Sequence, residues 1–180
     1  MSEILLLGDP RLRVPSAPVE DFANARFDEL ASTLKSFRAE HGFGRAISAP
    51  QIGIAQRFIA VNLGRGTFFV VNPVITWRSP DTFTMWDDCM SFPDLLVRVA
   101  RASSISIDYA DEHGRPKRWQ EMDRASAELL QHEIDHLDGI LAVDRAHGED
   151  ALMLRKAWEA NREYHEARVD YTITPTVSLS

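Results

Sequence analysis

The feature that most constrains this chain is the run Gln131-His132-Glu133-Ile134-Asp135-His136, which has two histidines four residues apart. On a helix, residues four apart lie on one face, so both imidazoles could bind a single metal ion. Glu133 would then lie beside the open coordination position, where a general base is useful. Because such a run also occurs by chance on solvated helices, it predicts a metal site without identifying the class of site.

The third metal ligand separates the classes of metallohydrolase that carry this motif. One class has a further histidine three residues after a glycine. Here Gly139 is present, but Ala142 holds the histidine position, so that class is excluded. A thermolysin-like site takes a glutamate from a later helix, and Glu159 or Glu163 remains an alternative for that role.

Cys89 is the better candidate for the third ligand. It is the only cysteine of the chain, so it cannot form an internal disulfide. A thiolate and two imidazoles leave one position for water, which is the arrangement of a catalytic metal site. An isolated cysteine is often an inert buried residue. Here, however, it lies in the polar run Asp87-Asp88-Cys89-Met90-Ser91, which is not a core pattern.

Length and composition set the remaining limits. With 180 residues and 44% hydrophobic content, we expect residues 1–180 to form a single domain. The net charge of −7 argues against general nucleic-acid binding, so any ribosome contact would be local and transient. The N-terminal sequence lacks a signal-peptide pattern, and no run of about 18 apolar residues could cross a membrane. We therefore expect a cytoplasmic protein without membrane contact, and the oligomeric state is left open.

Hydrophobic periodicity predicts a mixture of helices and strands. Apolar residues at spacings of three and four predict helices over 25–40 and 121–137, and a further helix is expected over 149–167. Runs rich in β-formers predict strands at 57–62, at 68–71 (ending at Asn72-Pro73) and at 104–109. The β-branched tail, 168–180, is either an edge strand or a loose end. Together these elements indicate an antiparallel or mixed sheet.

Three ordered segments resemble the peptide deformylase family. Its pattern is Gly-x-Gly-h-Ala-Ala-x-Gln, with h apolar, then Glu-Gly-Cys-Leu-Ser, then Gln-His-Glu-x-Asp-His. This chain has Gly44-Arg45-Ala46-Ile47-Ser48-Ala49-Pro50-Gln51, then Asp87 to Ser91, then Gln131 to His136. The resemblance covers about residues 4–145 and leaves 146–180 uncovered. It implies an α+β fold whose sheets pack around a central metal-binding helix, with one N-terminal and one C-terminal helix.

The resemblance also implies removal of the N-formyl group from the N-terminal methionine of peptides or nascent proteins. Glu133 would act as general acid and base, while the Gln51 amide and the Met90 backbone N–H would stabilise the oxyanion. One divalent ion per chain would be held by Cys89, His132 and His136. Ferrous iron is favoured by the resemblance, and zinc, nickel and cobalt suit the same ligands.

The chain departs from the family pattern in segments expected to line the substrate groove, where Gly44, Arg45, Ala46 and Asp88 are the candidate substrate-binding residues. Ala46 replaces a glycine, Asp87-Asp88 replace Glu-Gly, and Arg45 stands where the family has an apolar residue of the methionine pocket. A buried guanidinium needs a carboxylate partner. We therefore expect Arg45 either to pair with Asp87 or Asp88 across the groove or to extend into solvent.

Two other functions remain open. A paralogue could hydrolyse another N-acyl or formamide group with the same metal chemistry. A non-catalytic descendant could keep the metal as a structural element or bind formylated peptides. Glu133 and Gln51 argue against the descendant, because a structural site needs neither a base nor an oxyanion donor. The resemblance further predicts an ion pair between Asp135 and Arg101 that orients the metal-binding helix.

Overall fold

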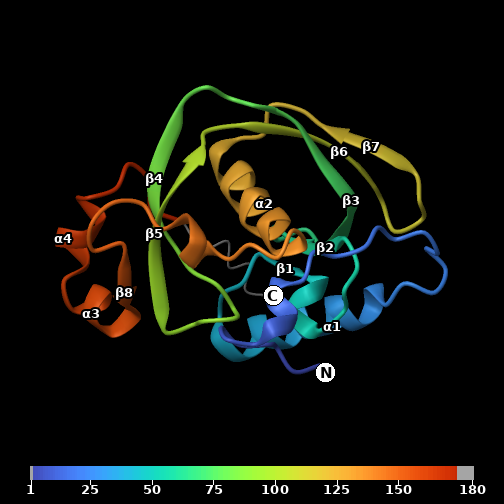
Figure 1. The fold of residues 1–180 in the computed structure, drawn as a ribbon, viewed down its shortest axis with the longest axis horizontal. Coiled ribbons are helices and arrows are strands. Elements are labelled where there is room, and N and C mark those ends of the chain that lie inside the picture. Colours follow the sequence, from blue (N-terminus) through green and yellow to red (C-terminus); the bar gives the residue numbers. More distant parts are fainter. Residues whose placement is uncertain (1, 174–180) are drawn as a thin grey trace.

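The structure, a computed structural model, describes residues 2–173. In this range two antiparallel sheets lie on either side of a central helix, α2 (Arg124–Leu137), as Figure 1 shows. The predicted α+β class is therefore confirmed. Among the helices of residues 2–173, none combines the length and hydrophobicity that a membrane span requires.

The larger sheet has five strands in the order β1-β2-β3-β6-β7 within the described range. Their bounds are Ala46–Ser48, Phe58–Asn62, Thr67–Arg78, Ile105–Ala110 and Pro116–Trp119. We expected the strand that starts near Phe68 to end at Asn72-Pro73, and this was wrong. The strand β3 continues past the proline, with a shift of register between Val71 and Val74 and a positive φ of 51° at Asn72. The proline therefore marks a bulge inside a strand.

The smaller sheet contains β4 (Thr82–Asp87), β5 (Leu95–Ala102) and β8 (Leu152–Leu154) in that order. Its central strand β5 pairs with β4 over six residues and with β8 over three. The strand β4 ends at Asp87, so the turn that follows it carries Cys89 to the face of the sheet that α2 covers.

The central helix α2 is buried along nearly its whole length. The side chain of Asp123 caps its N-terminus by accepting a hydrogen bond from the Ser126 N–H, and every residue from Ser126 to Leu137 is buried. Gly139 follows the helix with a φ of 73°, and a Cβ there would lie 2.6 Å from the carbonyl oxygen of Arg13. The close approach and the left-handed backbone both require glycine at this position.

Helix α1 (Phe27–His41) covers the outer face of β1 and β2. Gly42 ends it with a φ of 72°, as the sequence predicts. Its apolar stripe packs into one core cluster with residues of the sheet and the cavity: Phe27, Leu30, Leu34, Phe37, Ile47, Phe58, Ala60 and Met90. This packing fixes β1, which carries the first of the three family segments.

The remaining elements are short. Three single-turn 3-10 helices are η1 (Pro10–Arg13), η2 (Ala49–Ile52) and η3 (Ala142–Arg145). We expected one helix over 149–167, but the structure has strand β8 followed by α3 (Arg155–Ala160) and α4 (Arg162–Glu166), which are separated at Asn161. In the tail, Tyr171 forms a single bridge with Met85 of β4. The expected strand residues beyond Ile173 lie outside the described range.

Candidate metal centre

Three side chains converge on one point between α2 and the turn after β4. The Nε2 atom of His136 lies 3.2 Å from Nε2 of His132 and 3.2 Å from Sγ of Cys89. All three residues are buried, and their ligand atoms lie within 4.8 Å of one another. In residues 2–173 no other group of histidine, cysteine or acidic side chains is close enough to share an ion. The alternative third ligands, Glu159 and Glu163, are exposed on α3 and α4.

This donor set fits a catalytic metal ion. In a tetrahedral site, imidazole nitrogens and a thiolate at about 2.0–2.3 Å from the metal lie roughly 3.3–3.6 Å apart, close to the separations seen here. The Nδ1 atom of His132 lies 2.9 Å from the carboxylate of Asp87. A carboxylate in this place fixes the imidazole so that Nε2 is directed at the ion, which is common for metal-bound histidines. Three protein ligands leave one position open for water or substrate.

A chain of buried charges holds the metal-binding helix against the smaller sheet. Arg101 of β5 pairs with Asp87, at 3.0 Å, and with Asp135 of α2, so the predicted pair between Asp135 and Arg101 is confirmed. Arg145 also pairs with Asp135, at 2.8 Å. Burial alone would favour the neutral acid, but His132 and Arg101 hold the pKa of Asp87 well below its usual range. The carboxylate beside His132 is therefore ionised.

The thiol of Cys89 depends on a cation for its ionisation. Burial raises the pKa of Cys89 above its ordinary value, despite the opposing effect of His132. Without a neighbouring ion the sulfur therefore stays protonated at neutral pH. A coordinated thiol is deprotonated outright, so metal binding and loss of the thiol proton are coupled at this site.

Glu133 lies beside the three metal-binding residues and points into the same cavity. Its carboxylate accepts a hydrogen bond from the hydroxyl of Ser48, whose Oγ also lies 2.9 Å from the Glu133 backbone oxygen. Burial raises the pKa of Glu133 above its ordinary value, while His132 and the Ser48 hydrogen bond oppose the shift. A raised pKa suits a carboxyl group that takes up a proton and returns it near neutral pH.

The amide of Gln51 is held in one orientation. The backbone N–H of Ser48 donates to its Oε1 over 2.9 Å, which turns Nε2 toward Ser91 Oγ at 3.2 Å and Cys89 Sγ at 3.5 Å. The backbone N–H of Met90 donates to no residue in the described part of the chain. An N–H of this kind can serve a substrate oxygen.

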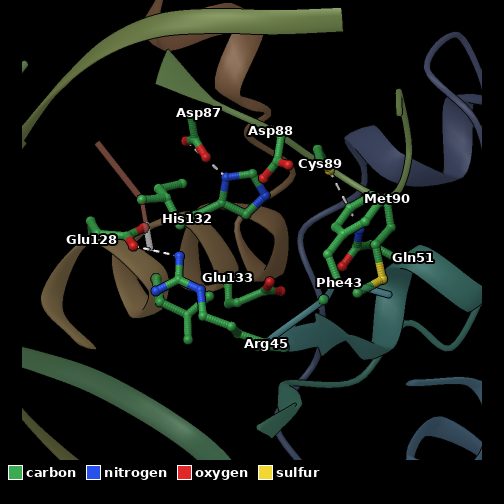
Figure 2. Close-up of a pocket in the computed structure, with 14 residues that line it drawn as sticks. Phe43, Arg45, Gln51, Asp87, Asp88, Cys89, Met90, Glu128, His132 and Glu133 are labelled. Atoms are coloured by element: carbon green, nitrogen blue, oxygen red, sulfur yellow. Dashed lines mark hydrogen bonds and ion pairs between the residues drawn. The ribbon is translucent and has the colours of Figure 1, made fainter. Parts of the chain in front are cut away.

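A cavity of about 90 Å³ opens onto the metal-binding residues (Figure 2). The segment Phe43 to Ala46 and the residues Asp87, Asp88 and Met90 line it together with residues of α2, so all four candidate substrate-binding residues border it. Gly44 has a φ of 113°, and a Cβ there would lie 2.6 Å from Cε of Met90. Glycine is therefore required at this position, whereas Ala46 is accommodated in β1 opposite Val61.

The expected partner of Arg45 was wrong. Arg45 pairs with Glu128 of α2, neither with Asp87 nor Asp88, and it does not extend into solvent. Asp87 is already bound to His132 and Arg101. Asp88 is bound to Arg155 of α3 at 3.1 Å. Arg155 also donates to the carbonyl of Pro93 and lies over the Phe43 ring, so it joins two sides of the cavity rim.

Two residues of the site were not predicted from the sequence. Glu128 lies four residues before His132, so helical spacing places it on the cavity face of α2, and this signal could have identified it. Ser48 stands where the family pattern has alanine, which is a fourth departure from that pattern. Its contact with Glu133 spans 85 residues of sequence, and only the alanine-to-serine difference pointed to it.

Comparison with known proteins agrees with this geometry. The family described as polypeptide deformylase matches residues 1–151. The peptide deformylase of Thermotoga sp. (strain RQ2) is 35% identical over 158 residues, which covers 87% of this chain and 93% of the relative. The crystal structure of peptide deformylase from Thermus thermophilus has a TM-score of 0.73 and 38% identity, and covers 91% of this chain and 94% of that one.

A third relative was solved with a peptide bound. It is a class I type b peptide deformylase from Acinetobacter baumannii with Met-Ala-Ser, which has a TM-score of 0.70 and 29% identity and covers 81% of this chain and 98% of that one. The sequence match spans most of both chains, and the fold matches over the same extent. The chain therefore belongs to the polypeptide deformylase family, whose members are metallohydrolases acting on N-formyl groups.

Proposed function

We propose that this protein is a metal-dependent hydrolase that removes the N-formyl group from the N-terminal methionine of peptides or nascent proteins. The observation that carries the proposal is one buried site in which three metal-binding side chains meet a carboxylate and an oriented amide. A structural metal site would need neither Glu133 nor Gln51.

Cys89, His132 and His136 would hold one divalent ion per chain. Bound there, the ion would lower the pKa of a water molecule toward neutrality and polarise the formyl group. The donor set suits ferrous iron, zinc, nickel and cobalt alike. We propose ferrous iron from the family resemblance, and we expect loss of activity in air through oxidation of the iron or of Cys89.

Glu133 moves the proton. Its carboxylate takes a proton from the attacking water and then gives it to the nitrogen of the leaving amine, so the carbon–nitrogen bond breaks as a carbon–oxygen bond forms. The products are formate and a peptide with a free N-terminus. The hydrogen bond from Ser48 fixes the carboxylate during both transfers.

Gln51 and Met90 stabilise the charge that develops on the formyl oxygen. The Gln51 amide is already turned toward the site by its bond from Ser48, so it needs no reorganisation during the reaction. The backbone N–H of Met90 provides the second donor. Two preorganised donors at one oxygen are typical of acyl-transfer sites.

The proposed partner is an N-formylated peptide at the end of a nascent chain, with local and transient contact to the ribosome in the cytoplasm. The Met-Ala-Ser ligand of the Acinetobacter baumannii relative has the sequence that deformylation of formyl-Met-Ala-Ser would produce. We propose the same class of substrate for this chain.

The test is release of formate from formyl-Met-Ala-Ser by the iron-loaded protein under anaerobic conditions. Glu133→Ala should keep one metal ion per chain and lower kcat by at least about 10²-fold. Glu163→Ala, at an exposed glutamate of α4, is the matched control and should leave both metal content and kcat unchanged. Metal-loaded wild-type protein that releases no formate from any formyl peptide would refute the function.

A further inference from the structure

One wall of the cavity carries an ion pair that the proposed chemistry does not use. Arg45 and Glu128 face each other with side chains only 10% and 2% exposed. Figure 2 shows Arg45 running beneath Glu133 toward Glu128, at the opposite end of the cavity from Met90 and Gln51. Among the described residues, neither partner hydrogen-bonds to the three metal-binding side chains, to Glu133 or to Gln51.

The pair keeps unused hydrogen-bonding groups at the cavity. A guanidinium carries five N–H donors. In the described structure Arg45 uses one for the carbonyl of Ala125, at 3.1 Å, and one for Oε1 of Glu128. The Oε2 atom of Glu128 accepts no hydrogen bond within residues 2–173. This end of the cavity therefore offers N–H donors and a carboxylate oxygen side by side.

We infer that this cavity selects substrates whose first side chain ends in a primary amide, glutamine above all, over apolar side chains of the same length. This inference rests on the proposed deformylase function. An amide matches both groups at once, because its oxygen can accept from Arg45 while its NH₂ donates to Glu128. Glutamine is also about as long as methionine.

The other side-chain classes fit this wall less well. An apolar side chain would displace water from the spare donors of Arg45 without supplying an acceptor, and leaving buried donors unpaired is costly. A carboxylate would satisfy Arg45 but would face the carboxylate of Glu128. An ammonium group would have the opposite conflict, with Arg45. Only a neutral group that both accepts and donates avoids all three penalties.

The test compares formyl-Gln-Ala-Ser, formyl-norleucyl-Ala-Ser and formyl-Glu-Ala-Ser on the iron-loaded wild-type protein. Norleucine has the length of methionine without its sulfur. We expect kcat/KM for the glutaminyl peptide to exceed that for the norleucyl peptide by at least about 10-fold. It should also exceed the value for the glutamyl peptide. A norleucyl or glutamyl peptide that is turned over as well as the glutaminyl one overturns the inference.

A double variant tests whether the ion pair causes the preference. Arg45→Leu with Glu128→Leu should reverse the ratio in favour of norleucine. The matched control is Arg118→Leu with Asp108→Leu, which removes an exposed ion pair between β6 and β7 and should leave the ratio unchanged. An unchanged ratio in the Arg45 and Glu128 variant overturns the inference.

Folding of the variant and failure of the function can be told apart from these outcomes. If the double variant shows no cooperative unfolding, Arg45→Lys replaces it, since lysine keeps the charge but loses the planar fork. That variant must lower the ratio of glutaminyl to norleucyl turnover several-fold, and an unchanged ratio counts against the inference. Absence of formate release from every peptide would refute the proposed function, whereas a reversed preference leaves it intact.

Discussion

The carboxylate of Asp87 lies 2.9 Å from Nδ1 of His132, while the opposite nitrogen of the same ring faces Cys89 and His136. Asp87 is the first residue of the run that also contains Cys89, so one short segment supplies a metal ligand and orients another. The same carboxylate binds Arg101. The position of the metal-binding imidazole therefore depends on a residue that does not touch the metal.

Replacing Asp87 by Asn should lower metal affinity about 10–100-fold, because the imidazole loses a charged partner that fixes its orientation and basicity. Competition with a chromogenic chelator measures the change. Asp88→Asn is the control, since Asp88 binds Arg155 and not His132. Equal affinities of the two variants would show that Asp87 has no role in metal binding.

Replacing Cys89 by Ala should abolish stoichiometric metal binding. Two imidazoles alone leave the site without the thiolate that completes the three-ligand set. Metal content per chain after desalting is the measurement. A variant that retained one ion per chain and full activity would refute the assignment of Cys89.

Replacing Ser48 by Ala should lower kcat about tenfold while KM and metal content stay constant. The lost hydrogen bond is one to a charged group, and its removal also allows the carboxylate to rotate. Because that bond lowers the pKa of Glu133, its loss raises the pKa, so the acidic limb of the pH profile of kcat/KM should move to higher pH.

The control for Ser48 is Ser104→Ala, which removes a hydroxyl-to-carbonyl bond to Met122 outside the cavity. It should change neither kcat nor the pH profile. Identical profiles for the two variants would mean that the Ser48 hydroxyl serves only packing.

Glu128 makes stability depend on pH in a defined direction. Burial raises its pKa to about 7, even though Arg45 opposes the shift. A carboxyl group whose pKa is higher in the folded than in the unfolded state contributes stability below the unfolded value, near 4.5, and that contribution is lost as the pH rises through about 7. The free energy of unfolding of wild type, relative to Glu128→Gln, should therefore fall by up to about 3 kcal/mol between pH 4.5 and 8.

Urea unfolding of metal-free wild type and Glu128→Gln at several pH values measures this difference. The glutamine keeps an acceptor for Arg45 and cannot titrate, so it isolates the proton linkage. Curves that stay parallel across the pH range would show that Glu128 titrates as an ordinary surface acid.

Truncation after Arg168 should destabilise the fold by about 1–2 kcal/mol. It removes Tyr171, whose ring packs on Phe83 with centroids 5.4 Å apart, and Asp170, which accepts two hydrogen bonds from Thr84 at 2.8 Å. Truncation after Ile173 retains these contacts and is the control. Equal free energies of unfolding for the two truncations would show that residues 169–173 add nothing to stability.

The sequence predicted those parts of the site that depend on local spacing. His132 and His136 lie on one face of α2 because they are four apart, and Gly42 and Asp123 cap helices through local backbone geometry. Family resemblance added Cys89 and Gln51, which come from distant segments. For these residues the sequence pattern and the structure agree.

The partner of Arg45 could not be read in the same way. Arg45 and Glu128 are 83 residues apart, and which carboxylate meets the guanidinium depends on how β1 packs against α2. Asp87 was the nearer candidate by motif, but His132 and Arg101 already occupy it. The continuation of β3 past Pro73 escaped for a related reason, since the pairing with β6 tolerates a bulge there.

The ligands of the metal centre belong to two different layers. His132 and His136 come from the central helix, whereas Cys89 follows an outer strand of the smaller sheet. An ion bound to all three would act as a cross-link between these layers, so the free energy of binding it would add to that of folding. A chain that lost its ion would open more often and become a better target for proteases. Supply of the metal would then set how long each copy of the protein survives as well as how fast it works.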